Sequence, residues 1–151
     1  IALPMMLMDP PGRVPIVPLL VNINMQPVPS AARCHALGGV LRETIDRYRP
    51  PQERVAVLAT GGLSHWLNVP RHGEVAEAFD RAMLASFEQG RVEQLTRLST
   101  AEIADRAGNG GLEIINWLLA AGAAPGWRGR TVFYESMPEW FTGMGALELH
   151  E

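Results

Sequence analysis

The sequence contains no lysine, has one cysteine, and lacks an apolar run long enough to cross a membrane. All 13 basic residues are scattered arginines, and the formal net charge of −3 gives no electrostatic case for nucleic acid binding. The lone Cys34 excludes an internal disulfide and fits a reducing cytoplasm, where we expect the protein to reside. Glu113 and Asn116 interrupt the longest apolar stretch, so no membrane partner is expected either.

The amino terminus carries no sign of a secretory leader. The stretch IALPMMLM is apolar, but it has no basic residues and runs directly into the turn DPPGR. The chain starts at Ile1 without an initiator methionine, which suggests a fragment or a missing earlier part. With 151 residues, 47% of them hydrophobic, the chain suits one domain with a substantial core.

The pattern of apolar residues and breakers predicts an α/β fold, with helices packed on a mostly buried mixed sheet. The continuous apolar run VAVLAT predicts a central strand, whereas Pro15 and Pro18 restrict residues 14–23 to an edge or bulged strand. Residues 138–151 are expected to form a loop-rich tail. The predicted strands are 1–8 (or an extended lead-in), 14–23, 55–60 and 130–137, and the predicted helices are 31–48, 73–88, 91–97, 100–107 and 110–121, the last capped by Asn109.

The first candidate site is the sequence GGLSH, residues 61–65, directly after the predicted central strand. Sites in α/β folds collect where strands end, and paired glycines allow a ligand to approach the backbone. A histidine such as His65 can exchange a proton near neutral pH. The alternatives are a tight turn with a structural histidine, a phosphate-binding loop, and a hydrolase that uses Ser64 with His65. The spacing matches neither phosphate-loop motifs nor the GxSxG elbow.

Glu113 is the second candidate, because it is the only charged residue between Ala107 and Trp127. An ionised carboxylate in such an apolar helix needs a cation, a metal or a raised pKa, unless it simply reaches solvent from the first turn. Glutamate is a hard oxygen ligand for Fe(II), Mn or Mg, and Asn116 could orient it. We interpret His35 as structural and His72 and His150 as surface residues, and TGMG at 142–145 as a close-approach loop or an ordinary chain reversal.

Four segments together resemble the class III extradiol ring-cleaving dioxygenases, namely the catalytic β subunit of protocatechuate 4,5-dioxygenase and the gallate and methylgallate dioxygenases. They are VAVLATGGLSHW, EVAEAFDRAML, GNGGLEIINWLLAAGA and VFYESMPEWFTGMG, and PIVPLLVNINMQPVPSAARCHALGGVLRETI fits the segment that precedes them. The resemblance implies that His65 is the acid/base histidine and Glu113 the carboxylate ligand of an Fe(II) site with two histidines. It also places the substrate's carboxylate end near Thr142 and Gly143, with Gly61, Gly62 and Ser64 lining the substrate.

The family's two iron-binding histidines have no counterpart in this sequence, because His35 and His72 do not lie in the corresponding motifs. We therefore expect residues 1–151 to be the carboxyl-terminal part of one catalytic domain that binds Fe(II), a catecholic aromatic acid and O2 only when complete. The resemblance also implies an oligomer, with a small α subunit or a fused equivalent. The alternative from a different class is a non-catalytic binding module with a vestigial site.

Overall fold

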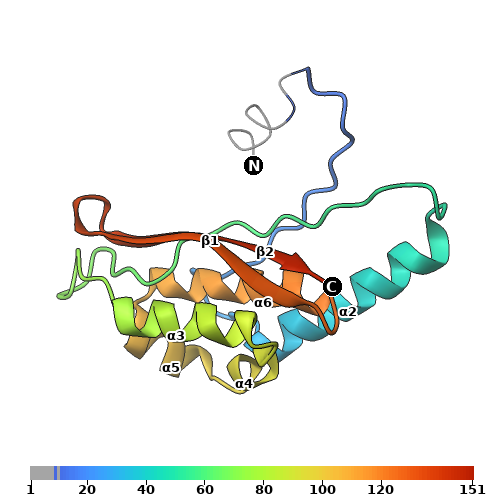
Figure 1. The fold of residues 1–151 in the computed structure, drawn as a ribbon. Helices are drawn as coiled ribbons and strands as arrows, with labels where there is room; N and C mark the ends of the chain where they lie inside the picture. The colour runs from blue at the N-terminus through green and yellow to red at the C-terminus, as the bar shows by residue number, and fades with distance from the viewer. Residues whose placement is uncertain (1–8, 10) are drawn as a thin grey trace.

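The computed structural model describes residue 9 and residues 11–151, so the strand or lead-in predicted for residues 1–8 lies outside the described part. Helices form one layer, and a two-stranded hairpin lies across it (Figure 1). The elements are α2 (Ala31–Tyr48), α3 (Glu77–Glu88), α4 (Val92–Thr96), α5 (Thr100–Ala107), the 3-10 helix η1 (Gly110–Glu113), α6 (Ile114–Gly122), β1 (Arg128–Met137), the 3-10 helix η2 (Pro138–Trp140) and β2 (Thr142–His150).

The hairpin is an antiparallel pair whose register runs from Arg128 opposite His150 to Met137 opposite Thr142. The prediction of a strand near 130–137 is confirmed, but the predicted loop-rich tail is wrong, because its second half is β2. Leu147 and Leu149 face the core while Glu148 between them is exposed. This period of two is the pattern of a half-buried strand, and the glycines that precede it obscured it in the sequence.

The predicted mixed sheet is not found among residues 9 and 11–151, where the two-stranded hairpin is the only sheet. The segments 14–23 and 55–60, which were predicted as strands, run without strand pairing (Figure 1). Val57 and Leu58 are 40% and 56% exposed, so the segment predicted to be central and buried lies at the surface. A strand exists only where a neighbour accepts its backbone hydrogen bonds, and no described segment takes that place. The coarser assignment of helices packed against a sheet holds.

Most predicted helices form, with shifts at their beginnings. Helix α2 has the predicted bounds and is capped by Ser30, and α5 begins after a capping box between Ser99 and Glu102. Helix α3 starts at Glu77 instead of residue 73, because the Ala76 N–H still donates to the Ser64 hydroxyl at 2.7 Å. The predicted helix 110–121 divides into η1 and α6, and Asn109 does not cap it.

Helices α2 and α6 pack at very short range because glycines face each other across the contact. A Cβ placed on Gly38 would overlap the Leu119 carbonyl oxygen, and one on Gly122 would overlap the His35 carbonyl oxygen. This contact closes the core beneath α6, whose residues from Ile114 to Gly122 are almost all buried. Helix α6, which directly follows Glu113, is therefore fixed by its packing against α2.

Neighbouring glycines in α2 provide a matched test of this packing. We expect Gly38→Ala to lower the free energy of unfolding by about 1–3 kcal/mol, because the new methyl group overfills a backbone contact. Gly39→Ala should raise it by about 0.5–1 kcal/mol, since alanine is the better helix former. A Cβ at Gly39 meets no atom closer than the Gly122 oxygen at 3.9 Å. Urea unfolding of both variants measures the difference, and equal destabilisation would contradict the close packing.

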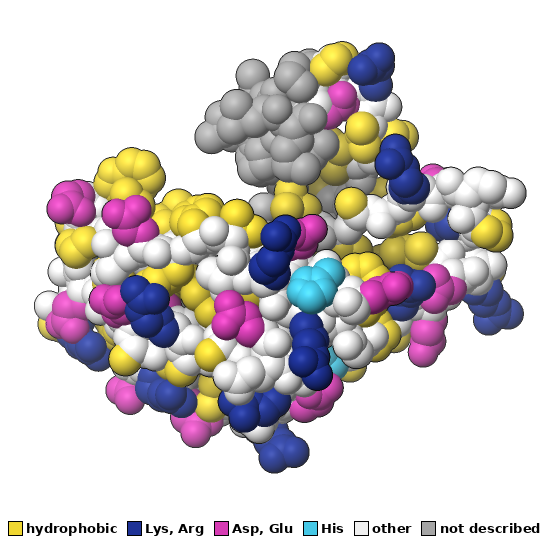
Figure 2. Space-filling view, in the orientation of Figure 1, with side chains coloured by type: hydrophobic (Ala, Val, Ile, Leu, Met, Phe, Trp, Pro, Cys, Tyr) yellow, Lys and Arg dark blue, Asp and Glu magenta, His cyan; other side chains and the backbone are white. Residues whose placement is uncertain are grey.

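The surface of the helical layer is charged in a mixed way. Figure 2 shows acidic and basic side chains interspersed over the helices on the face viewed, without an extended area of one sign. Several of these charges form exposed pairs within one helix, such as Arg42 with Asp46 and Arg81 with Glu77. Among the described residues, no helix combines the length and apolar character needed to cross a membrane.

Candidate functional site

The loop that carries GGLSH is fixed by backbone hydrogen bonds to two distant segments. The Leu63 N–H donates to the Gly143 carbonyl at 3.1 Å, and the Gly143 N–H donates to the Ser64 carbonyl at 3.0 Å. On the other side, the His65 N–H donates to the Ala107 carbonyl at 2.8 Å at the end of α5. The loop is thus held between the start of β2 and the turn that leads into η1, although it has no regular structure of its own.

The His65 side chain is buried, with 8% of its surface exposed, and has one defined orientation. Its Nδ1 lies 2.8 Å from the Leu63 carbonyl oxygen. A carbonyl oxygen can only accept, so the proton of the neutral ring belongs on Nδ1, and Nε2 keeps its lone pair. The Cδ2–Nε2 edge rests directly against Gly110, where any Cβ would overlap the ring. The ring is therefore held in the form that can accept a proton at Nε2.

Glu113 ends η1 and is half-buried. Its Oε2 accepts a hydrogen bond from the Gly62 N–H, and no residue among 9 and 11–151 donates to its Oε1. Gly61 has a φ of +136°, and a Cβ there would lie 2.7 Å from the Glu113 Cβ. Gly61 is thus required by the close approach of the Glu113 side chain, and Oε1 of the carboxylate accepts no hydrogen bond from the described residues.

Gly62 is the point at which the separately predicted site residues meet. Its N–H binds the Glu113 carboxylate. A Cβ on Gly62 would lie 3.0 Å from the Thr142 Oγ1 and 3.3 Å from the His65 Cε1. Residues 62, 65, 113 and 142 are distant in sequence and come from a loop, a 3-10 helix and a strand. The structure therefore brings Glu113, His65 and Thr142 around one glycine.

Ser64 takes no part in a nucleophilic pair with His65. Its hydroxyl accepts from the Ala76 N–H at 2.7 Å and donates its single proton to Asp80 Oδ2 at 2.7 Å. The His65 Nδ1 is meanwhile bonded to Leu63, so the histidine does not act on the Ser64 hydroxyl. The hydrolase hypothesis is therefore wrong, and the buried Ser64 hydroxyl has no proton left for a substrate.

Asp80 is the buried polar residue that sequence reasoning missed. It lies on the apolar face of α3 between Phe79 and Met83, and its surface is entirely buried. Burial raises the pKa of Asp80, and hydrogen bonds from Ser64 and Tyr134 act in the opposite direction. The signal was present in the sequence, since this aspartate occupies a core position of an amphipathic helix, one turn before Leu84.

Two asparagines fix the chain around the site. The Asn109 side chain bonds both the N–H and the carbonyl of Leu67 at 2.9 Å, which explains why it does not cap the next helix. The Asn116 amide donates to the Thr60 carbonyl at 3.0 Å, so it holds the start of the glycine loop instead of orienting Glu113. The Trp117 indole donates to the Gly61 carbonyl at 3.2 Å and completes this anchor.

The remaining histidines and the cysteine lie apart from this arrangement. His72 is exposed and packs against Phe141 with ring centroids 4.7 Å apart, and His150 bonds the Glu151 carbonyl at the chain end. Cys34 is buried in α2, which raises the pKa of its thiol. Within the described part of the chain, no three His, Cys, Asp or Glu side chains gather closely enough to hold a metal ion.

Comparison with known proteins identifies similar sequences. Residues 1–145 match the family described as the catalytic LigB subunit of aromatic ring-opening dioxygenase. Gallate dioxygenase from Pseudomonas putida is 38% identical over 109 residues, which cover 72% of this chain and 32% of that protein. A 2,3-dihydroxyphenylpropionate/2,3-dihydroxicinnamic acid 1,2-dioxygenase from Escherichia coli is 27% identical, over 89% of this chain and 57% of that protein. The chain thus spans between about a third and somewhat over half of these relatives.

Proposed function

Because the chain belongs to the family of catalytic LigB subunits of aromatic ring-opening dioxygenases, we propose that it is part of an Fe(II)-dependent extradiol dioxygenase. Residues 1–151 would form the carboxyl-terminal part of its catalytic domain, with the histidine ligands supplied from outside this segment. The observation that carries the proposal is the meeting of Glu113, His65 and Thr142 around Gly62.

Glu113 is the residue that would hold the metal. Its carboxylate is half-buried, is fixed by the Gly62 N–H through one oxygen, and keeps the other oxygen free of hydrogen bonds from described residues. A fixed hard oxygen donor of this kind suits Fe(II). When bound, the metal would bring the catecholic substrate and O2 together for ring cleavage. One carboxylate alone cannot fix a coordination sphere, so the complete protein is needed.

His65 would move the proton. Its Nδ1 proton is held by the Leu63 carbonyl, and Nε2, which forms no hydrogen bond with residues 9 and 11–151, would accept a proton from a substrate hydroxyl and return it later. Burial of the ring and its contact with Gly110 restrict its motion, so that the same nitrogen serves both steps. This role differs from that of a ligand, because it requires the lone pair of Nε2 to face the substrate.

The substrate would be a catecholic aromatic acid of the gallate or protocatechuate type. The support is the relative named gallate dioxygenase, with which this chain shares 38% identity. Gly61 lies against Glu113, and Gly62 lies against Thr142 and His65, so the backbone of the two glycines and the Thr142 hydroxyl would line the ring. Ser64 and Gly143, whose polar groups are bonded within the fold, would contribute by holding the loop. A small α subunit or a fused equivalent, and an oligomeric assembly, complete the proposal.

Oxygen uptake by the complete natural protein tests this function. Loaded anaerobically with Fe(II) and supplied with protocatechuate or gallate, it should consume one O2 per ring and form a coloured ring-fission product. Catechols without a carboxylate are the controls that show whether cleavage requires the carboxylate of the aromatic acid. Absence of uptake with every catechol at full iron loading would overturn the proposal and leave a non-catalytic binding module of the same fold.

Gly110 gives a further test through the His65 ring. We expect Gly110→Ala to lower kcat by about 100-fold, because the methyl group must displace the ring from its position and small misplacements are costly. Iron content should be unchanged, since the added methyl group meets the His65 ring, whereas the Glu113 carboxylate is held by the Gly62 N–H. The matched control is Gly39→Ala, which adds the same methyl group where its nearest neighbour, the Gly122 oxygen, is at an ordinary contact distance of 3.9 Å. Steady-state kinetics with both variants provide the comparison, and equal activity would contradict the close packing of ring and glycine.

A further inference from the structure

Asp80 is a buried carboxylate that accepts three hydrogen bonds from hydroxyl and amide donors, and no residue among 9 and 11–151 forms an ion pair with it. The Ser64 N–H donates to Oδ1 at 2.9 Å, and the Ser64 and Tyr134 hydroxyls donate to Oδ2 at 2.7 and 2.9 Å. Arg81, its neighbour in α3, is exposed and pairs with Glu77. Burying a carboxylate without an ion pair is costly, so the three hydrogen bonds define a specific arrangement.

Two of these hydrogen bonds hold Ser64. Ser64 lies in the chain between His65 and Leu63, the residue whose carbonyl oxygen binds the His65 ring. Leu63 supplies the carbonyl that binds Nδ1, and Ser64 is joined directly to both Leu63 and His65. The backbone of Leu63 is held by β2 and that of His65 by the end of α5. Among residues 61–65, Ser64 is the only one held by a buried carboxylate, through both its main chain and its side chain.

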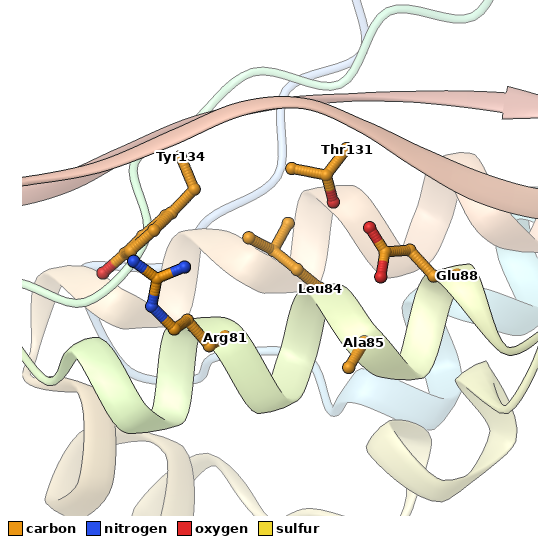
Figure 3. Close-up of a pocket in the computed structure, with 6 residues that line it drawn as sticks. All are labelled: Arg81, Leu84, Ala85, Glu88, Thr131 and Tyr134. Atoms are coloured by element: carbon orange, nitrogen blue, oxygen red, sulfur yellow. The ribbon is translucent and has the colours of Figure 1, made fainter.

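The β1–β2 hairpin also contacts the Asp80 carboxylate, through Tyr134 and Gly143. Figure 3 shows Tyr134 reaching from β1 towards α3, with the Arg81 side chain beside it, and the Arg81 guanidinium lies 4.8 Å from the ring centroid. A Cβ on Gly143 would overlap the Asp80 Oδ2, so the start of β2 is in direct contact as well. Asp80 thus connects α3, the hairpin and the loop of the candidate site.

We propose that Asp80 is a positioning residue for His65: by holding Ser64 it fixes the Leu63 carbonyl and thereby the ring with its proton on Nδ1. The inference rests on the proposed function only for its kinetic consequence, since the orientation of the ring can be observed without turnover. Asp80 touches no substrate and supplies no proton, and its effect passes through one residue.

Asp80→Asn in the complete iron-loaded protein tests the proposal. Asparagine has one acceptor oxygen and an NH2 group that only donates, so it cannot accept all three hydrogen bonds, and Ser64 loses part of its anchor while the side-chain volume stays nearly the same. We expect kcat to fall by about 10- to 100-fold, with the KM for the aromatic acid within a few-fold and the bound iron unchanged. Tyr134→Phe, which leaves both bonds to Ser64, should change kcat much less. Leu95→Ala in α4 should lower the unfolding midpoint without lowering kcat.

Imidazole nitrogen NMR of the metal-free protein gives the second measurement. The wild-type His65 should show a protonated Nδ1 and an unprotonated Nε2, whereas Asp80→Asn should show mixed tautomers. If Asp80→Asn fails to fold, Ser64→Ala replaces it, since it removes the hydroxyl and keeps the N–H bond. Unchanged ring signals together with unchanged kcat would overturn the proposal. If the wild type cleaves no catechol, the proposed function fails, and the ring signals alone decide whether Asp80 positions His65.

Discussion

Replacing His65 by alanine should lower turnover by about 100- to 10,000-fold while the protein keeps its iron. The reason is that His65 accepts and returns a proton at Nε2 but does not bind the metal. Its Nδ1 is occupied by the Leu63 carbonyl, and its Cδ2–Nε2 edge lies against Gly110. The KM for the aromatic acid should change little, because the interaction is made mainly during the proton transfers.

Single-turnover kinetics and iron analysis on the same preparation check this expectation. The control is His150→Ala, which removes an exposed imidazole at the chain end and should leave turnover unchanged. A His65→Ala protein that loses its iron would make His65 a ligand and exchange the roles assigned to the two residues. Full activity in that variant would remove the histidine from the mechanism.

Glu113→Gln should abolish stable iron binding while leaving the fold intact. The glutamine oxygen can still accept the Gly62 N–H, so the loop keeps its anchor. A neutral amide is a much poorer ligand than a carboxylate, and losing even an outer hydrogen-bond partner of a ligand costs about 10- to 100-fold in metal affinity. We expect a larger loss here, together with loss of oxygen uptake.

Titration of the metal-free protein with Fe(II) under anaerobic conditions measures this affinity. Glu43→Gln, an exposed position on α2, is the matched control and should bind iron like the wild type. The unfolding midpoint of Glu113→Gln should stay close to that of the wild type. Undiminished iron affinity in that variant would exclude Glu113 from the coordination sphere.

The helices could be predicted from the sequence because their signals are local. Helices α2 and α5 have the predicted bounds, 31–48 and 100–107, because each begins directly after a serine that caps it, Ser30 and Ser99. The beginning of α3 was misplaced, since its position depends on a bond between Ala76 and the distant Ser64. Pairing of strands is also a long-range property, which is why residues 55–60 read as a buried strand and yet are exposed here.

The candidate site shows the same division between local and distant information. Glu113 stood out because it is a lone charge in an apolar segment, and His65 because it follows two glycines. Asp80 was missed although its place beside the apolar residues of α3 was a signal, because its complete burial and its hydrogen-bond partners on distant segments are known only from the structure. Likewise, a sequence shows no partner for the Ser64 hydroxyl, so the hydrolase hypothesis could be rejected only when Asp80 and Ala76 were found bonded to it.

The central claim is that Glu113 and His65 have different roles in one iron site: Glu113 binds the metal, and His65 exchanges a proton with the substrate. A crystal structure of the complete protein with Fe(II) and a bound aromatic acid, prepared without oxygen, tests it most directly. The account predicts that Glu113 coordinates the iron and that the His65 Nε2 lies about 3 Å from a hydroxyl of the bound ring. A Glu113 carboxylate outside the coordination sphere, or an Nε2 that faces away from the substrate, would contradict it.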